Sequence, residues 1–231
     1  NMLGFLILLF CVMAAAPVYS ADYQSGADQI LRCTKYGRRT LGTAKAAAAL
    51  IISGISFAAC SIVYIFTANS LFGWESTKTS IQMVYSILTL TGITIGQLQW
   101  LFAFAGLLSV CASVSLALFL SSRCKNIVLP LGAAFVSCIA PTAACMALPD
   151  GLSSWICTLL PASGTSIQAS ILYALTDFRF LTAGGFAVWL PYAMMGACII
   201  EIPLFLALAV GLTVGIRQAV NAGIQKNFEK L

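Results

Sequence analysis

The residue whose type and position most directly suggest chemistry is Glu201, the single acidic residue in the last predicted membrane-spanning stretch. A carboxylate there can take up and release a proton or a cation. Burying a charge in a bilayer costs about 3 kcal/mol on insertion scales, so such a residue is a functional hypothesis by default. Alternatively, the span begins near residue 200, the carboxylate reaches the outer headgroups, and Pro203 lies in the first helical turn. The sequence leaves both interpretations open.

The sequence has few other residues or motifs that are typical of catalytic sites. The chain has no histidine, which removes His-dependent proton relays, Ser-His proteolysis and His-Glu-x-x-His metal sites. Gly37 and Gly42 have the interval of a phosphate-binding P-loop, but no Lys-Ser/Thr pair follows, because the chain continues to Lys45 through Thr-Ala. We therefore expect no enzymatic activity and no metal or cofactor bound by this chain.

The nine cysteines do not predict a disulfide framework. Most lie inside predicted spans, where cysteine behaves as a small hydrophobic residue: Cys11, Cys60, Cys111, Cys138, Cys145 and Cys198. Cys33 and Cys124 are expected on the cytoplasmic side, where thiols stay reduced. Cys157 alone is expected outside, with no obvious partner.

The charge pattern predicts the elements that hold these residues. The chain is 60% hydrophobic, and ten of its 12 Lys and Arg residues fall in three short segments. These are Arg32, Lys35, Arg38, Arg39 and Lys45; Arg123 and Lys125; and Arg217, Lys226 and Lys230. If these segments face the cytoplasm, positive residues divide ten inside to two outside.

This division predicts an all-α polytopic membrane protein of about five transmembrane helices, with an external N-terminus and a cytoplasmic C-terminus. The expected spans are 2–20, 46–68, 98–120, 127–149 and 194–216. The net charge of +5 is then an orientation signal, and we expect no nucleic-acid partner.

An external start without a signal suggests that a further span precedes Asn1. The rival interpretation is a cleavable signal peptide, with Met2–Phe10 as its apolar region and Val18–Ala21 as a small-residue cleavage site, although the positive region is missing.

The longest polar segment is 22–45, with five positive residues against Asp22 and Asp28, a net charge of +3. Apolar residues recur at helical spacing over 27–36, which predicts a short helix that ends at Gly37. This helix could lie on the membrane or dock into a partner. The alternative is a solvated basic loop that only sets topology.

Two external segments are also expected to be helical. Residues 80–96 predict an interfacial helix, and Gly92 and Gly96, like Gly211 and Gly215, predict close helix packing. The apolar but broken segment 150–193 predicts two short re-entrant helices that dip into the outer leaflet.

Several of these features together resemble the permeases of ABC-2-type exporters. They are Asp22, Ser25 and Gly26 after a span, then 31–34, Gly37-Arg38-Arg39 and Lys45, the turn Ser121–Asn126, and the long external segment before the last helix. The chain departs from the family in its missing first span and its long 80–96 segment.

The resemblance implies a permease whose segment 22–45 carries the coupling helix that contacts a separate ABC ATPase subunit. The implied contact residues are Asp28, Arg32, Lys35, Arg38 and Arg39. ATP and Mg would be bound by that partner. The resemblance also implies a second permease copy or a homologous permease, a bacterial cytoplasmic membrane, and an apolar or amphipathic cargo. The alternatives are an ion- or proton-coupled carrier that uses Glu201, and a membrane subunit that transports nothing.

Overall fold

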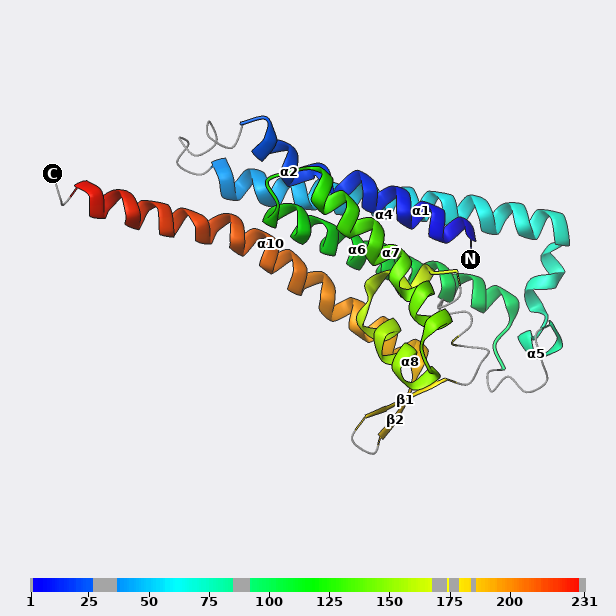
Figure 1. The fold of residues 1–231 in the computed structure, drawn as a ribbon. Coiled ribbons are helices and arrows are strands. Elements are labelled where there is room, and N and C mark those ends of the chain that lie inside the picture. Colours follow the sequence, from blue (N-terminus) through cyan, green and yellow to red (C-terminus); the bar gives the residue numbers. More distant parts are fainter. Residues whose placement is uncertain are drawn as a thin grey trace.

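A computed structural model describes residues 2–26, 37–84, 92–167, 174, 179–183 and 186–228. Its long helices lie side by side in an elongated bundle, with a small hairpin at one end (Figure 1). In chain order the elements are α1 (Met2–Ala15), α2 (Pro17–Gln24), α4 (Gly37–Phe72), η1 (Trp74–Lys78), α5 (Ile81–Val84), α6 (Ile95–Arg123), α7 (Val128–Ala147), α8 (Asp150–Leu159), η2 (Pro161–Thr165), β1 (Phe180–Ala183), β2 (Phe186–Trp189) and α10 (Leu190–Phe228).

Five helical stretches of the described residues are long and apolar enough to cross a membrane, which confirms the predicted fold class. They are Met2–Gln24, Thr40–Phe72, Ile95–Arg123, Val128–Ala147 and Leu190–Gly211. The chain is thus a multi-pass membrane protein. Gly37 is the first described residue of α4. The helix predicted over 27–36 lies outside the described residues.

Helix α6 is the centre of the bundle. It is the most buried of the five spanning helices and contacts α1, α4, α7, α10 and η2. Leu8 and Val12 of α1 pack with Val110 and Leu118 of α6 in the main core cluster. Helix α6 is apolar on all sides, as expected for a helix surrounded by others.

The outer surface of the bundle is apolar as well. Helix α4 is the least buried span and exposes a row of large side chains that includes Ile51, Ile52 and Ile55. An exposed apolar surface of this extent suits contact with lipid. The exposed apolar side chains therefore agree with the membrane location that the sequence predicts.

A close approach inside the bundle occurs at Gly106 of α6. A Cβ added there would lie 2.5 Å from Cζ of Phe57 on α4. At Gly96 the nearest atoms belong to Thr77 of η1, at 3.2 Å, so the neighbour is a turn and not a helix. Within the described residues, no atom lies within 4 Å of a Cβ built at Gly92 or Gly211, and the surroundings of Gly215 lie outside the description.

The helix predicted over 80–96 is wrong as a continuous element. The described part has the single turn α5, a β-bridge between Ser80 and Thr94, and the start of α6 at Ile95. Thr94 begins α6 with a capping box: its hydroxyl accepts from the Gln97 N–H, and the Gln97 side chain accepts from the Thr94 N–H. This cap explains why α6 starts three residues earlier than predicted.

The described part of segment 150–193 contains the expected helix α8, followed by the buried turn η2. Ala174 is also helical, but the residues on either side of it lie outside the description. The Ser109 hydroxyl donates to the carbonyl of Pro161 at 2.5 Å, so η2 is tied to α6 about 20 Å along that helix from its start. Residues 180–189 differ from the prediction, because β1 and β2 pair there as antiparallel strands, with Phe180 opposite Trp189. Helix α10 follows directly.

Candidate functional site

The residues predicted to contact an ATPase are only partly within the structure. Asp28, Arg32 and Lys35 lie outside the described residues. Arg38 and Arg39 lie in the first turn of α4, and their side chains are likewise outside the description. The contacts of these five side chains therefore lie outside the description, but the structure does define the two ends of the segment that carries them.

An ion pair joins these two ends. The Lys45 ammonium on α4 lies 2.7 Å from Oδ1 and 2.5 Å from Oδ2 of Asp22 on α2. Both side chains are only partly exposed, at 30% for Lys45 and 25% for Asp22. A pair of this kind contributes on the order of 1 kcal/mol, and it also holds α2 beside the start of α4.

A buried hydrogen bond reinforces this contact. The Tyr19 hydroxyl on α2 donates to the carbonyl of Gly42 on α4 at 2.6 Å. Tyr19 itself is buried. An ion pair and a hydrogen bond therefore hold together the two stretches of chain that flank 27–36.

Ser121 of α6 connects the same place to the centre of the bundle. Helix α1 ends at Ala15 and α2 begins at Pro17, since proline lacks an N–H and its ring disfavours the preceding helical turn. The N–H groups of Tyr19 and Ser20 in α2 both donate to the Ser121 hydroxyl oxygen at 3.0 Å. The Ser121 hydroxyl in turn donates to Oγ of Ser20 at 3.5 Å.

We call this set the polar junction; it consists of Tyr19, Ser20, Asp22, Gly42, Lys45 and Ser121. It joins α2, α4 and α6 at one end of the bundle. Arg123, the last residue of α6, therefore lies at the same end as segment 22–45. This arrangement agrees with the expectation that both basic segments share one side of the membrane.

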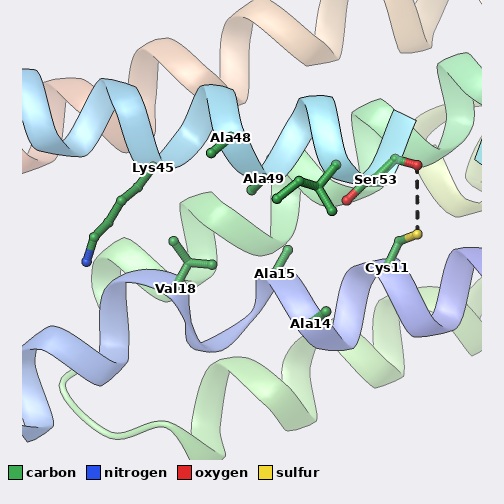
Figure 2. A pocket seen from close by; sticks show the side chains of 9 residues that line it. Cys11, Ala14, Ala15, Val18, Lys45, Ala48, Ala49 and Ser53 are labelled. Carbon is green, nitrogen blue, oxygen red and sulfur yellow. Dashed lines mark hydrogen bonds between the residues drawn. The ribbon is translucent and has the colours of Figure 1, made fainter. Parts of the chain in front are cut away.

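A groove runs from the polar junction along the interface of α1, α2 and α4 (Figure 2). Its volume is about 430 Å³, and small side chains line it, among them Ala14, Ala15, Ala48 and Ala49. Lys45 lies at one end of the row of labelled residues, and the contact of Cys11 with the Ser53 carbonyl, at 4.0 Å, lies at the other. The groove is apolar along its length and charged at one end.

A second cavity of about 480 Å³ lies between the start of α1, α4 and α6. Its lining is mostly apolar, with Ser61, Tyr64 and Gln99 as polar members. The Gln99 and Asn69 amides bond to each other reciprocally, at 3.0 and 3.2 Å. Cavities of this size and polarity suit an apolar ligand or an acyl chain.

Glu201 lies well inside α10, which begins at Leu190. Pro203 is likewise interior, so the interpretation in which the helix starts near 200 and Pro203 lies in its first turn is wrong. One carboxylate oxygen of Glu201 is buried and has no hydrogen-bond partner among the described residues. The sequence also singled out this residue, and its role stays a prediction.

The polar junction was not predicted as a site. Asp22, Lys45 and Ser121 entered the sequence argument only as parts of a charge count and a loop pattern, and Tyr19 did not enter it as a contact. Within the described part of the chain, no group of three His, Cys, Asp or Glu residues could hold a metal ion.

Comparisons with family models, with curated proteins and with solved structures found no match to this chain.

Proposed function

We propose that this chain is the membrane-spanning permease subunit of an ATP-driven ABC exporter, which uses a separate ATPase subunit to move an apolar or amphipathic substrate. The observation that carries the proposal is the polar junction. It clamps together the two ends of the segment that would hold the coupling helix, and it ties both to α6.

The mechanism follows from these contacts. Closure of two ATP-bound nucleotide-binding subunits pushes on 27–39. Because Asp22 and Lys45 are paired across the ends of this segment, the push reaches α1, α2 and α4 together. The bonds from α2 to Ser121 pass it on to α6. A path then opens between this permease and a second copy or a homologous permease, toward the external elements that begin with α8.

The character of the cargo follows from the cavities. The groove and the second cavity are lined mainly by apolar side chains, with few polar groups to hold a hydrophilic molecule. This favours a lipid, an apolar peptide or a drug-like compound. ATP and Mg are bound by the partner, in keeping with the absence of a Lys-Ser/Thr pair after Gly37 and Gly42. In this proposal the chain lies in a bacterial cytoplasmic membrane.

The decisive experiment is co-purification in detergent with a candidate ABC ATPase subunit, followed by ATPase measurements in liposomes. The variant is Arg38→Glu with Arg39→Glu. Two reversals on a docking surface replace attraction by repulsion, which can cost several kcal/mol at an interface. We expect both association and stimulated ATPase activity to fall.

The matched control is Lys125→Glu with Lys226→Glu, which makes the same change of charge on the same predicted side but outside segment 22–45. This variant should retain association. If both double variants associate as well as the wild type, segment 22–45 is a basic loop that only sets orientation, and the coupling assignment fails.

A variant of the polar junction separates docking from coupling. Lys45→Gln removes the ion pair with Asp22 but leaves the basic residues of 27–39 in place. We expect association to remain and the stimulation of ATPase activity by an apolar cargo to weaken. Loss of association with Lys45→Gln would mean that Lys45 belongs to the docking surface itself.

The second candidate function is an ion- or proton-coupled carrier, favoured by the buried and unpartnered carboxylate oxygen of Glu201. Glu201→Gln removes the titratable group and keeps the shape of the side chain. In an ABC permease this variant should leave ATPase coupling largely intact. Complete loss of transport in the folded variant, together with transport by the wild type without any ATPase, would establish the carrier instead.

A further inference from the structure

Cys145 and Cys157 form a pair of thiols that the proposed function does not use. Their sulfur atoms lie 3.3 Å apart, the distance of a thiol hydrogen bond. Cys145 lies near the end of α7 and Cys157 near the end of α8, on either side of the turn that contains Pro149. The expectation that Cys157 has no partner is therefore wrong.

The pair lies at the end of the bundle opposite the polar junction. Helix α7 starts at Val128, just after the Arg123 end of α6, so its other end, which carries Cys145, is remote from the basic turn. The positive-residue bias makes this the outer side, where thiols meet an oxidising environment. Cys157 is buried, whereas Cys145 is partly exposed.

We propose that Cys145 and Cys157 form a structural disulfide bond that staples α8 to the outer end of α7. Sulfur atoms at 3.3 Å must approach by a little over 1 Å to reach the bond length of about 2.05 Å. This shift needs side-chain rotation and a small adjustment of α8. The pairing does not depend on the exporter assignment.

The oxidant is a disulfide-bearing thiol oxidoreductase or a small-molecule disulfide on the outer side. The partly exposed Cys145 thiol attacks one sulfur of this oxidant, which gives a mixed disulfide and releases the first thiol with its proton. The Cys157 sulfur then attacks the Cys145 sulfur, and the second thiol of the oxidant leaves with the Cys157 proton. The two cysteines lose two electrons and two protons in all, and the oxidant gains them.

Burial influences which cysteine reacts first. It raises the pKa of the Cys157 thiol to about 12, so this thiol is ionised far less often than an exposed cysteine. Cys157 in the folded protein is therefore a poor partner for external reagents. It reacts with Cys145 because the two sulfur atoms are held in contact.

The disulfide bond would fix the end of α8 and the turn η2 to the neighbouring helices. The Cys157 carbonyl accepts a hydrogen bond from the Ser163 hydroxyl at 2.5 Å, and the carbonyl of Pro161 accepts one from Ser109 of α6. Residues 157–163 are thus already tied to α6 through η2. A bond to Cys145 adds a covalent link to α7, so that the end of α8 and η2 are attached to two spanning helices.

The test is a fragment map of the full chain. Cells are lysed directly in SDS with excess N-ethylmaleimide and no reductant, and the protein is cleaved with trypsin and cyanogen bromide. The chain has no Lys or Arg between Lys125 and Arg179, and Met146 is the only methionine there. The fragments are therefore 126–146, with Cys138 and Cys145, and 147–179, with Cys157. We expect one linked species that separates on reduction.

Two variants identify the cysteines involved. Cys138→Ala should leave the linked species unchanged, whereas Cys145→Ala should abolish it and leave Cys157 alkylated. In the wild type, unlinked fragments that carry maleimide on both Cys145 and Cys157 would overturn the proposal without recourse to any variant. A linked species that survives Cys145→Ala would overturn the pairing.

Discussion

Ser121→Ala should destabilise the protein far more than the loss of one hydroxyl from a helix surface. The Ser121 oxygen is the acceptor for the N–H groups of both Tyr19 and Ser20, and all three residues are buried. Each buried donor left without an acceptor costs about 1–3 kcal/mol. Tyr19 is the third residue of α2, so its N–H has no acceptor within the helix, whereas the Ser20 N–H also has the carbonyl of the N-cap residue Ala16 as its helical acceptor. The expected loss in the free energy of unfolding is therefore that of one donor, about 1–3 kcal/mol.

The neighbouring residue provides a matched control. Ser122 is also buried, but its hydroxyl donates to the carbonyl of Phe119 in its own helix, at 2.7 Å. Ser122→Ala therefore leaves no N–H group unpaired and should cost less than about 1 kcal/mol. Ser121→Thr keeps a hydroxyl and should recover part of the stability lost in Ser121→Ala.

The assay is unfolding by SDS titration in dodecyl maltoside micelles, followed by circular dichroism and by alkylation of the buried Cys138. The midpoint for Ser121→Ala should fall well below those of Ser122→Ala and the wild type. If the two alanine variants unfold together, the Ser121 hydroxyl does not serve as the acceptor for the two N–H groups of α2. That result would show that the polar junction is not connected to α6 through Ser121.

Two further predictions test packing and orientation. Gly106→Ala places a Cβ 2.5 Å from the Phe57 ring and should lower the free energy of unfolding by about 1–3 kcal/mol. Gly132→Ala, with no described atom within 4 Å of the added Cβ, should be neutral or stabilising because alanine favours a helix. If both variants behave alike in the SDS titration, the close packing at Gly106 is excluded. Gly151→Cys, at an exposed position, should react with an impermeant thiol reagent from outside intact cells above the wild-type background, and Thr40→Cys should not; external labelling at Thr40 would reverse the orientation and remove the coupling assignment.

The spans were predictable because length and the absence of charge are sufficient signals in a bilayer. All five were located, with boundaries that differ mainly where a local cap or a long continuous helix intervenes. Helix α4 runs from Gly37 to Phe72, well beyond the predicted 46–68. Nothing in the charge pattern stops a helix at a membrane edge, so it continues past the apolar run.

The hairpin of β1 and β2 had a signal that the prediction did not use. Phe180–Ala183 and Phe186–Trp189 are short runs with aromatic and β-branched residues, and the sequence places only Gly184 and Gly185 between them. This spacing is typical of a β-hairpin. The apolar but broken composition of 150–193 was interpreted as two short re-entrant helices instead.

The polar junction could not be predicted, because its contacts join residues far apart in the chain. Tyr19 and Ser121 are separated by 102 positions, and a serine in a spanning helix has no periodic pattern that identifies its partner. The same holds for the pair Asn69 and Gln99. Only Glu201 was identified from the sequence, because a lone acid in an uncharged run stands out without any knowledge of its neighbours.

Polar contacts tie α6 to its neighbours at three depths. Gln99 bonds to Asn69 of α4, Ser109 to η2, and Ser121 to α2. These positions are about 15 Å and 18 Å apart along the helix axis. Helix α4 is thus held to α6 directly near one end and, through Lys45 and Asp22 on α2, indirectly near the other. A force on 27–36 that separated α2 from α4 would have to break the ion pair and the bond from Tyr19 to Gly42, whereas a force that moves α2, α4 and α6 together breaks none of these contacts. The second motion requires less energy, so we expect these helices to respond as one body.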